Sequence, residues 1–295
     1  MKILILGSNG YLGSNFSLFL REKNLKVYHS DIHESPIYDW MNYHQINLLE
    51  FDFEEFFQNK KIDFIYLFSG LTGTLGSFKS SDKFIEVNTV GVSRVLQALI
   101  NLKNQPTIIF PSTRLVYQGS SSALKEEANK QLNTPYAISK FSAENLIQAF
   151  ERLYQVNFYI FRISIPYGNI GSSDYSFGTI GSFIEQLKEN GRIILFGDGL
   201  QKRTFTSIVD ICTIFNKCMS SNLRVNEIYN IGGEELSLNA AAEIIAGDSK
   251  HIFFKEWPNE YLRIESWDTV FCSEKLDVQI DKKYLKLSEI QDFKK

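Results

Sequence analysis

Residues 2–13 read KILILGSNGYLG, an apolar run that ends in three glycines spaced three apart, Gly7, Gly10 and Gly13. The apolar run predicts a buried β-strand, and the residues after Gly10 have the pattern of a helix. Such a turn can hold a pyrophosphate, because backbone N–H groups and the helix N-terminus point at the ligand. Asn9 stands where the usual fingerprint has glycine, and asparagine tolerates the left-handed conformation. By itself the stretch fits a structural turn as well as a cofactor site.

The next predicted strand, residues 26–30, leads into Asp31, 18 positions after Gly13. A carboxylate at this place in a strand–helix–strand unit accepts hydrogen bonds from the hydroxyls of an adenosine ribose. The carboxylate repels a 2′-phosphate, and no arginine stands beside it. The pattern therefore favours NAD over NADP as cofactor, with an exposed turn aspartate as the alternative interpretation.

The first half of the chain alternates buried strands with helices. These elements are predicted over residues 45–48, 51–59, 63–68, 82–102, 107–111, 135–154 and 158–163. The rhythm predicts an α/β fold, a Rossmann-like doubly wound parallel sheet with helices on both faces. Later in the chain the alternation loosens, which indicates a smaller C-terminal α/β substrate lobe. We expect an NAD-binding domain over residues 1–165 and the substrate lobe over residues 166–295, interleaved near residues 205–220.

The composition of the 295-residue chain restricts the classes of function. Hydrophobic residues make up 44 %, enough for a substantial core, while a net charge of -3 with scattered lysines predicts no nucleic-acid surface. No apolar run approaches the roughly 18 residues of a membrane helix, so no membrane partner is expected. Three cysteines without metal-type spacing fit reduced thiols in a cytoplasmic protein. The four histidines are not paired at helical spacing, so no metal site is predicted.

Tyr136 and Lys140 carry the clearest catalytic signal, in the sequence YAISK. Thr134 and Pro135 predict the N-cap and first residue of a helix, so Tyr136 and Lys140 lie four apart on one face. A phenol with a pKa of about 10 is a poor base near neutrality, but a nearby ammonium and a cationic nicotinamide favour the phenolate. The same pair on an exposed helix face would carry no chemistry, so the signal depends on its neighbours.

Ser112 and Thr113 follow the strand predicted over residues 107–111. Ligands bind at the carboxyl ends of parallel strands, so a hydroxyl there can bond the substrate oxygen whose proton Tyr136 exchanges. Serine and threonine after a strand often only cap a turn, and that alternative stays open.

Taken together, these motifs resemble those of the extended short-chain dehydrogenase/reductase family, in its nucleotide-sugar epimerase and dehydratase branch. The similarity covers nearly the whole chain. Besides the residues already named, it rests on Phe68-Ser69-Gly70, Asn88 with Gly91, Val116-Tyr117, Arg162, Tyr167-Gly168, residues 197–205 with Asp210, and residues 229–233.

The resemblance implies roles for individual residues. Thr113 holds a sugar oxygen, Tyr136 is the acid and base, and Lys140 lowers the pKa of the tyrosine while bonding the nicotinamide ribose. The implied NAD site comprises Gly7, Asn9, Gly10, Tyr11, Leu12, Gly13, Asp31, Asn47, Leu48, Phe68, Ser69, Gly70, Asn88, Tyr136 and Lys140. The implied substrate site comprises Thr72, Thr113, Tyr136, Ile165, Arg203 and Arg263, where Arg203 matches an arginine that grips the nucleotide diphosphate. For Arg263 a surface position is an equal alternative.

Several positions depart from the family pattern. Dehydratases of the family place Asp-Glu after the catalytic threonine, where this chain has Arg114 and Leu115, so 4,6-dehydration is disfavoured. Many 4-epimerases have asparagine where this chain has Ile165, which puts the usual UDP-hexose in question. Asn47 replaces an adenine-contacting aspartate and can still bond the base edge.

The resemblance thus implies an NAD-dependent nucleotide-sugar 4-epimerase that acts on a nucleotide-diphosphate sugar through a transient 4-keto sugar. A nucleotide 4-keto-6-deoxysugar reductase using NAD(P)H is the alternative that uses the same residues. A non-catalytic NAD-sensing protein is a third hypothesis, and the presence of Tyr136 with Lys140 counts against it. A homodimer formed through residues 82–102 and 135–154 is also implied.

Overall fold

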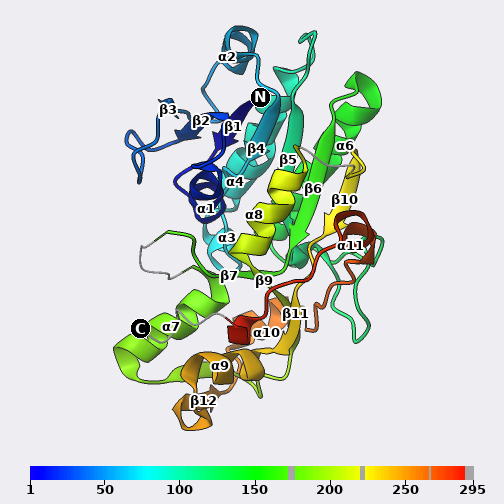
Figure 1. The fold of residues 1–295 in the computed structure, drawn as a ribbon. Helices are drawn as coiled ribbons and strands as arrows, with labels where there is room; N and C mark the ends of the chain where they lie inside the picture. Colours follow the sequence, from blue (N-terminus) through cyan, green and yellow to red (C-terminus); the bar gives the residue numbers. More distant parts are fainter. Residues whose placement is uncertain (172–176, 220–222, 266, 290–295) are drawn as a thin grey trace.

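A parallel sheet of seven strands forms the centre of the molecule (Figure 1). The structure is a computed structural model that describes residues 1–171, 177–219, 223–265 and 267–289. The strands stand in the order β10 (Glu227–Asn230), β6 (Phe158–Ile163), β5 (Thr107–Thr113), β4 (Phe64–Leu67), β1 (Lys2–Leu6), β2 (Lys26–Asp31) and β3 (Tyr43–Gln45). Strand β2 pairs with β1 on one side and β4 pairs with it on the other, so the order of the strands reverses at β1. Ligands of such sheets bind at the point of reversal, so a crevice is expected where the carboxyl ends of β1 and β4 meet.

Helices cover both faces of this sheet (Figure 1), which confirms the predicted doubly wound α/β class. Side chains of β1 alternate between two core clusters, Ile3 and Ile5 in one, Leu4 and Leu6 in the other. The first face is covered by α1 (Tyr11–Leu20), α8 (Ile208–Lys217) and α11 (Glu274–Ile280). The opposite face is covered by α2 (Phe53–Lys60), α5 (Gly91–Gln97) and α6 (Pro135–Tyr154).

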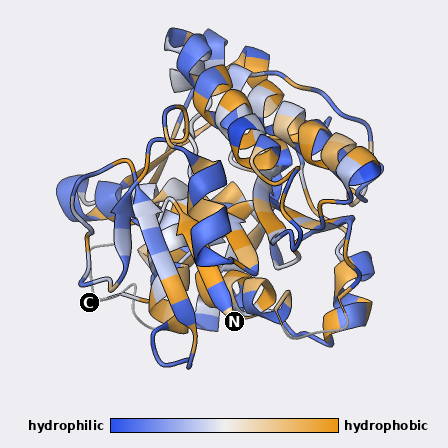
Figure 2. Cartoon of the chain, turned by 90° about the horizontal axis from the view of Figure 1, so that it is seen from above, coloured by the Kyte–Doolittle hydropathy of each residue, from blue (hydrophilic) through white to orange (hydrophobic). Residues whose placement is uncertain are grey.

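The helices are amphipathic, which explains how they pack on the sheet. In Figure 2 they carry hydrophobic and hydrophilic stripes side by side, the pattern of a helix with one face in a core. The α6 helix begins as predicted, with the Thr134 side chain accepting a hydrogen bond from the N–H of Ala137 at 3.1 Å and Pro135 in the first turn. None of the helices among the described residues is long and apolar enough to cross a membrane.

The helix predicted over residues 82–102 is interrupted. It consists of α4 (Ser81–Ile85), a π-helical turn over Glu86–Val90 and α5, and it follows the short α3 (Gly76–Lys79). Asn88 lies inside the π-helical turn and is 2 % exposed. The hydrophobic period of the segment predicted a helix but not the wider π-helical turn, which is a feature often found at functional sites.

A smaller lobe, below the large sheet in Figure 1, holds a three-stranded and a two-stranded sheet. Its elements are β7 (Ile165–Tyr167), β9 (Lys202–Ser207) and β11 (Glu234–Ser237), β8 (Ile193–Phe196) with β12 (Ile252–Lys255), and the helices α7 (Gly178–Asn190), α9 (Leu238–Ala246) and α10 (Asn259–Ile264). Short helical turns cover Arg114–Val116, Ser249–His251 and Leu287–Glu289. A separate cluster of apolar side chains forms the core of this lobe.

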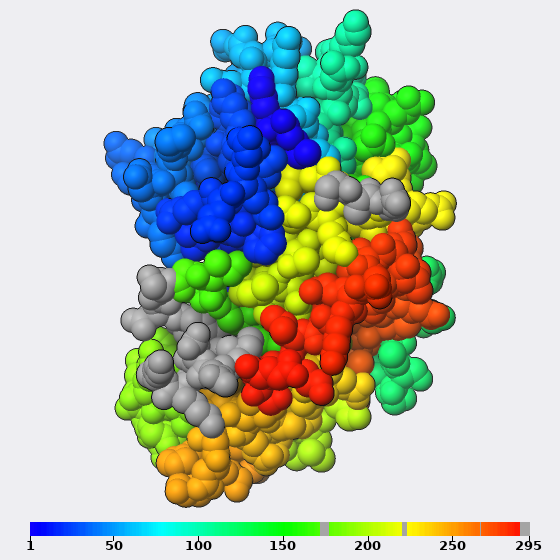
Figure 3. Space-filling model, viewed as in Figure 1, coloured from blue at the N-terminus to red at the C-terminus, as the bar shows by residue number. Residues whose placement is uncertain are grey.

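The chain returns from the smaller lobe to the large sheet through α8 and β10. The red C-terminal segment also lies against the yellow segment that contains α8 (Figure 3), where Leu276 and Ile280 of α11 join the core beside Ile211. The boundary near residue 165 stays a prediction. One predicted strand is shifted: β3 covers Tyr43–Gln45 rather than residues 45–48, so Asn47 lies in the loop after the strand.

Candidate active site

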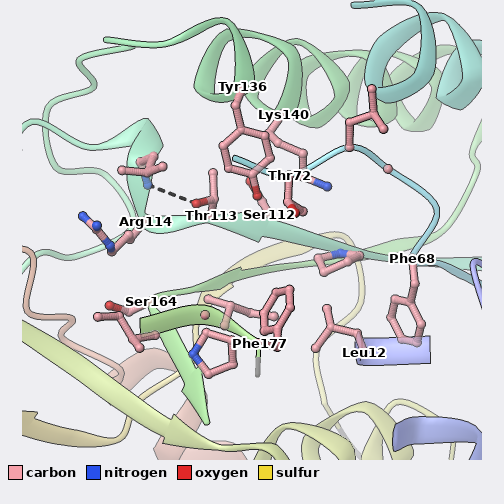
Figure 4. Close-up of a pocket in the computed structure, with 18 of the residues that line it drawn as sticks. Leu12, Phe68, Thr72, Ser112, Thr113, Arg114, Tyr136, Lys140, Ser164 and Phe177 are labelled. Atoms are coloured by element: carbon pink, nitrogen blue, oxygen red, sulfur yellow. Dashed lines mark hydrogen bonds between the residues drawn. The ribbon is translucent and has the colours of Figure 1, made fainter. Parts of the chain in front are cut away.

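Two adjoining cavities lie at the carboxyl ends of the central strands, and they share Phe68, Gly70 and Leu71. The first, drawn in Figure 4, contains Leu12, Thr72, Thr113, Tyr136, Lys140 and Ile165. The second contains Gly7, Asn9, Gly10, Asp31, Asn47, Leu48 and Ser69. Residues predicted to bind the adenosine end of a dinucleotide are therefore separated from the predicted catalytic residues by one shared wall.

The glycine turn, Gly7 to Gly13, is the predicted site of the pyrophosphate, and its backbone is open to a ligand. Gly7 has a φ of +89°, and a Cβ added there would lie 2.5 Å from the backbone nitrogen of Ser69. A Cβ on Gly13 would overlap the carbonyl oxygen of Gly7. No side chain caps the N-terminus of α1 behind Gly10, so its N–H groups suit a phosphate. These features fit NAD, because they allow close approach of backbone to a ligand that a side chain would obstruct.

Asn9 does not adopt the left-handed conformation expected from the sequence, since Gly7 is the residue of this turn with positive φ. Its backbone N–H donates to Asp31 Oδ2 at 3.1 Å, and its side-chain amide donates to the carbonyl oxygen of Ser35 at 3.0 Å. Its Oδ1 accepts from the N–H of Ile37 at 3.2 Å. Asparagine therefore joins the turn to the loop after β2, which is a reason for its presence that the turn chemistry did not predict.

Replacement of Gly7 by alanine is expected to weaken NAD binding by at least about tenfold, because a positive φ costs about 1–3 kcal/mol and the Cβ meets backbone. Titration calorimetry with NAD measures the effect. Gly76→Ala is the control, because Gly76 has open space around its Cβ position and no positive φ. Equal affinities for NAD in the two variants would show that this turn is not the cradle.

Asp31 stands at the end of β2 and lines the second cavity, 9 % exposed. Its Oδ1 accepts from the N–H of His33 at 3.4 Å, while Oδ2 is held by Asn9. Asn47 and Leu48 line the same cavity from the loop after β3. The predicted ribose-binding carboxylate and the predicted adenine contact thus lie together at one end of the cleft.

Asp31→Asn is expected to reduce the preference for NAD over NADP by at least about tenfold. The neutral amide still bonds a ribose hydroxyl but no longer repels a 2′-phosphate. Paired calorimetric titrations with NAD and NADP give the ratio of dissociation constants. Glu34→Gln removes an exposed charge three residues away and is expected to leave that ratio unchanged. A ratio that changes equally in both variants would assign the effect to net charge alone.

Tyr136 and Thr113 both line the first cavity, and the hydroxyl of Tyr136 points toward Thr113 (Figure 4). Thr113 Oγ1 accepts a hydrogen bond from the N–H of Leu115 at 3.2 Å. Burial raises the pKa of Tyr136, and the Thr113 hydroxyl and the charge of Arg114 lower it without outweighing burial. Among the protein's own groups burial therefore dominates and the pKa of the phenol is raised. The lowering expected from Lys140 and a bound nicotinamide stays a prediction.

Lys140 lies on the same face of α6, 7 % exposed, with its Nζ 3.8 Å from the ring centroid of Phe110. Burial lowers the pKa of Lys140 to about 7, and the carboxylate of Glu144 acts in the opposite direction. Near neutrality the side chain is therefore easily protonated and deprotonated. Its predicted contact with the nicotinamide ribose and its effect on Tyr136 stay predictions.

A buried ion pair holds α6, the helix of Tyr136 and Lys140, against the central sheet. Glu144, one turn after Lys140, pairs with Arg162 of β6 through Nη2–Oε2 and Nε–Oε1 distances of 2.6 and 3.1 Å. Ser112 Oγ donates to the same carboxylate, and Arg162 Nη1 donates to the hydroxyl of Tyr117 at 2.7 Å. The pair joins α6 to β6, and Ser112 joins the same carboxylate to β5, the strand that presents Thr113.

Three other predicted residues support the site from outside the lining. Asn88 Oδ1 accepts from the N–H of Leu71 at 2.8 Å, and its amide donates to the carbonyl oxygen of Leu71 at 3.0 Å and to Ser139 Oγ at 3.1 Å. Tyr11 donates to the carbonyl oxygen of Gly168 at 2.8 Å. Gly13 keeps the turn and α1 in contact.

The structure does not bring the two predicted phosphate-binding arginines into the cavity lining. Arg203 is 1 % exposed and pairs with Glu265, while also donating to the carbonyl oxygens of Lys202 and Trp267. Arg263 is exposed on α10. Both predicted contacts with a diphosphate stay predictions.

Sequence reasoning gave no binding role to Arg114 and Ser164, and it did not predict the contact of Phe177 with Tyr11. Arg114 and Ser164 line the first cavity beside Thr113, and Phe177 stacks on Tyr11 with ring centroids 4.1 Å apart. The position of Arg114 directly after Thr113 was a usable signal, whereas the ring contact joins segments far apart in sequence. Within the described ranges, no three histidine, cysteine or carboxylate side chains form a metal-binding group.

Comparison with known proteins identifies the family. Residues 3–232 match the NAD dependent epimerase/dehydratase family. The chain belongs to this family. The expected extended short-chain dehydrogenase/reductase membership and the expected cofactor, NAD, are thereby confirmed.

Curated relatives of the chain include dehydratases and epimerases. The chain is 29 % identical to a dTDP-D-glucose 4,6-dehydratase of Dictyostelium discoideum over 83 % of its own length, and spans only 61 % of that protein. It is 27 % identical to a putative UDP-glucose 4-epimerase of Methanocaldococcus jannaschii, with 82 % of this chain and 81 % of that protein aligned.

Solved structures share the fold of this family member. Pal from Bacillus thuringiensis has a TM-score of 0.86 at 22 % identity, with 98 % of this chain and 96 % of that chain covered. A UDP-glucuronic acid 4-epimerase from Bacillus cereus, solved with UDP-glucuronic acid and NAD, has a TM-score of 0.82 at 23 % identity over the same shares of the two chains.

Proposed function

We propose that this family member is an NAD-dependent nucleotide-sugar 4-epimerase. The observation that carries the proposal is that Thr113, Tyr136 and Lys140 line one cavity, which adjoins the predicted NAD cleft. Arg114 and Leu115 line this cavity where dehydratases of the family have an acid and a base. A guanidinium and an alkyl side chain supply neither, so the site favours epimerisation over dehydration.

In the proposed reaction Thr113 holds the oxygen on carbon 4 of the sugar, and Tyr136 as phenolate takes the proton from that oxygen. The charge of Arg114 lowers the pKa of the phenol and thus favours the phenolate. NAD supplies the removal and return of the hydride at carbon 4. The 4-keto sugar turns over in the cavity, and Tyr136 returns its proton to the new hydroxyl. No cofactor is consumed, because oxidation and reduction cancel.

A 4-keto-6-deoxysugar reductase is the second candidate, favoured by Ile165. This side chain is 5 % exposed and lines the cavity where many 4-epimerases have an asparagine. In that reaction Tyr136 gives a proton to the keto oxygen, and one equivalent of reduced cofactor is used for each turnover.

A panel of UDP-, dTDP-, GDP- and CDP-sugars separates the two candidates. We expect the purified protein to interconvert a pair of 4-epimers with no added NAD(P)H, followed by chromatography or NMR of the sugar. A product that forms only with stoichiometric NAD(P)H would identify the reductase and exclude the epimerase.

We also propose that the protein is a cytoplasmic homodimer that pairs through α4, the π-helical turn and α6. Ile85, Val90 and Ile138 are large hydrophobic side chains on these elements and are 37–41 % exposed. Burial of such side chains against a second copy is favourable. Light scattering of the purified protein tests the dimer, and Ile138→Glu is expected to shift it towards monomer.

A further inference from the structure

Arg114 places a guanidinium in the lining of the catalytic cavity, next to Thr113. It begins the helical turn Arg114–Val116 directly after β5, so it stands beside Thr113 in the lining (Figure 4). Arg114 and Lys140 are the cationic residues of the described lining, and that lining contains no carboxylate. The part of the cavity next to Thr113 is therefore suited to an anionic group.

A hydrogen bond to Thr269 holds the guanidinium of Arg114. Its Nη1 donates to Thr269 Oγ1 at 3.2 Å, and Thr269 is fully buried beside Arg203. Burial and the charge of Arg203 lower the pKa of Arg114 to about 9, while Glu265 and Tyr136 raise it. The group stays a cation at neutral pH. An anionic group of a ligand beside the guanidinium would offset part of its desolvation.

A second polar group lines the same cavity. The hydroxyl of Ser164, between β6 and β7, is buried and has no hydrogen-bond partner within the part of the chain that the structure describes. Buried hydroxyls are nearly always bonded in native proteins. An oxygen-rich ligand group in the cavity would supply this bond.

We propose that the sugar is a uronic acid and that Arg114 binds its carboxylate, an inference that rests on the proposed function. Thr113 and Tyr136 place the oxygen of carbon 4, and the neighbouring residue Arg114 must then meet a neighbouring part of the sugar. Carbon 5, which bears the carboxylate of a uronic acid, adjoins carbon 4 in a pyranose. Carbon 1, which bears the diphosphate, lies across the ring. A guanidinium fork matches a carboxylate in a bidentate manner.

Binding of UDP-glucuronate, UDP-glucose and UDP, measured by calorimetry on the intact protein with NAD, tests the assignment. The same measurement is made with dTDP-linked glucuronate and glucose. We expect the uronate to bind at least about tenfold more tightly than the hexose in one nucleotide series. Binding is the readout because Arg114 also affects the pKa of Tyr136.

Arg114→Gln is expected to abolish this preference, and Arg114→Lys to retain part of it. Arg152→Gln, an exposed arginine of α6, is the control and should keep the full preference. Equal losses for UDP, UDP-glucose and UDP-glucuronate in Arg114→Gln would assign Arg114 to the diphosphate and overturn the proposal. Absence of a uronate preference in both nucleotide series would also overturn it. Tight uronate binding without epimerisation would refute the proposed function alone.

Discussion

Tyr136→Phe is expected to lower kcat by about 10³-fold, because loss of a positioned acid and base costs roughly 10²–10⁴ in rate. The ring of the new side chain keeps its edge contact with Phe84, whose centroid lies 6.2 Å away, so the fold and NAD binding should be retained. The measurement is the rate of interconversion of the sugar pair found with the nucleotide-sugar panel, together with an NAD titration.

Tyr154→Phe serves as the control for this variant. Tyr154 is a partly exposed residue at the last turn of the same helix, far along the chain from the cavity. Its variant should turn over at the wild-type rate. A Tyr136→Phe enzyme as fast as the control would remove Tyr136 from the chemistry and favour the NAD-sensing hypothesis.

Glu144→Leu is expected to destabilise the protein by about 3–5 kcal/mol, since Arg162 is then left as an uncompensated buried charge. Glu144 and Arg162 are 0 % and 2 % exposed, so water cannot replace the lost carboxylate. Free energies of unfolding from urea titrations give the difference. Asn145→Leu, at an exposed position on the same helix, is expected to change the free energy of unfolding by less than about 0.5 kcal/mol.

The double variant Glu144→Leu, Arg162→Met sharpens the test. Removing both charges leaves no unpaired ion, so the double variant should be more stable than Glu144→Leu alone. A Glu144→Leu loss below about 1 kcal/mol would mean that the pair contributes little to holding α6 on the sheet.

The sequence predicted those parts of the molecule whose signals are local. Strand β1 is a short apolar run before glycine, and α6 is marked by a capping threonine, a proline and a hydrophobic period, so both were assigned correctly. Asp31 and Thr113 follow from the rule that ligands bind at the carboxyl ends of parallel strands, and Tyr136 from its spacing to Lys140 on one helix face. The π-helical turn at Asn88 carries no comparable local pattern.

Other parts of the site depend on contacts between distant residues. Nothing near Arg203 indicates that Glu265, 62 positions later, would occupy its guanidinium. Glu144 and Arg162 are likewise joined only once α6 has packed on β6. Burial raises the pKa of Tyr136, and the spacing of residues along a helix does not reveal how deeply a side chain is buried.

Asn88 connects the wall that the two cavities share to helix α6. Through three hydrogen bonds one amide side chain fixes Leu71, which belongs to both cavity walls, to Ser139 on the catalytic helix. A ligand in one cavity that shifts Leu71 is therefore expected to change the shape of the other cavity. The free energy needed to order Leu71 is then shared by the ligands of the two cavities. If the proposed sugar occupies the first cavity, we expect it and the cofactor to be linked ligands, each changing the affinity for the other by the same factor.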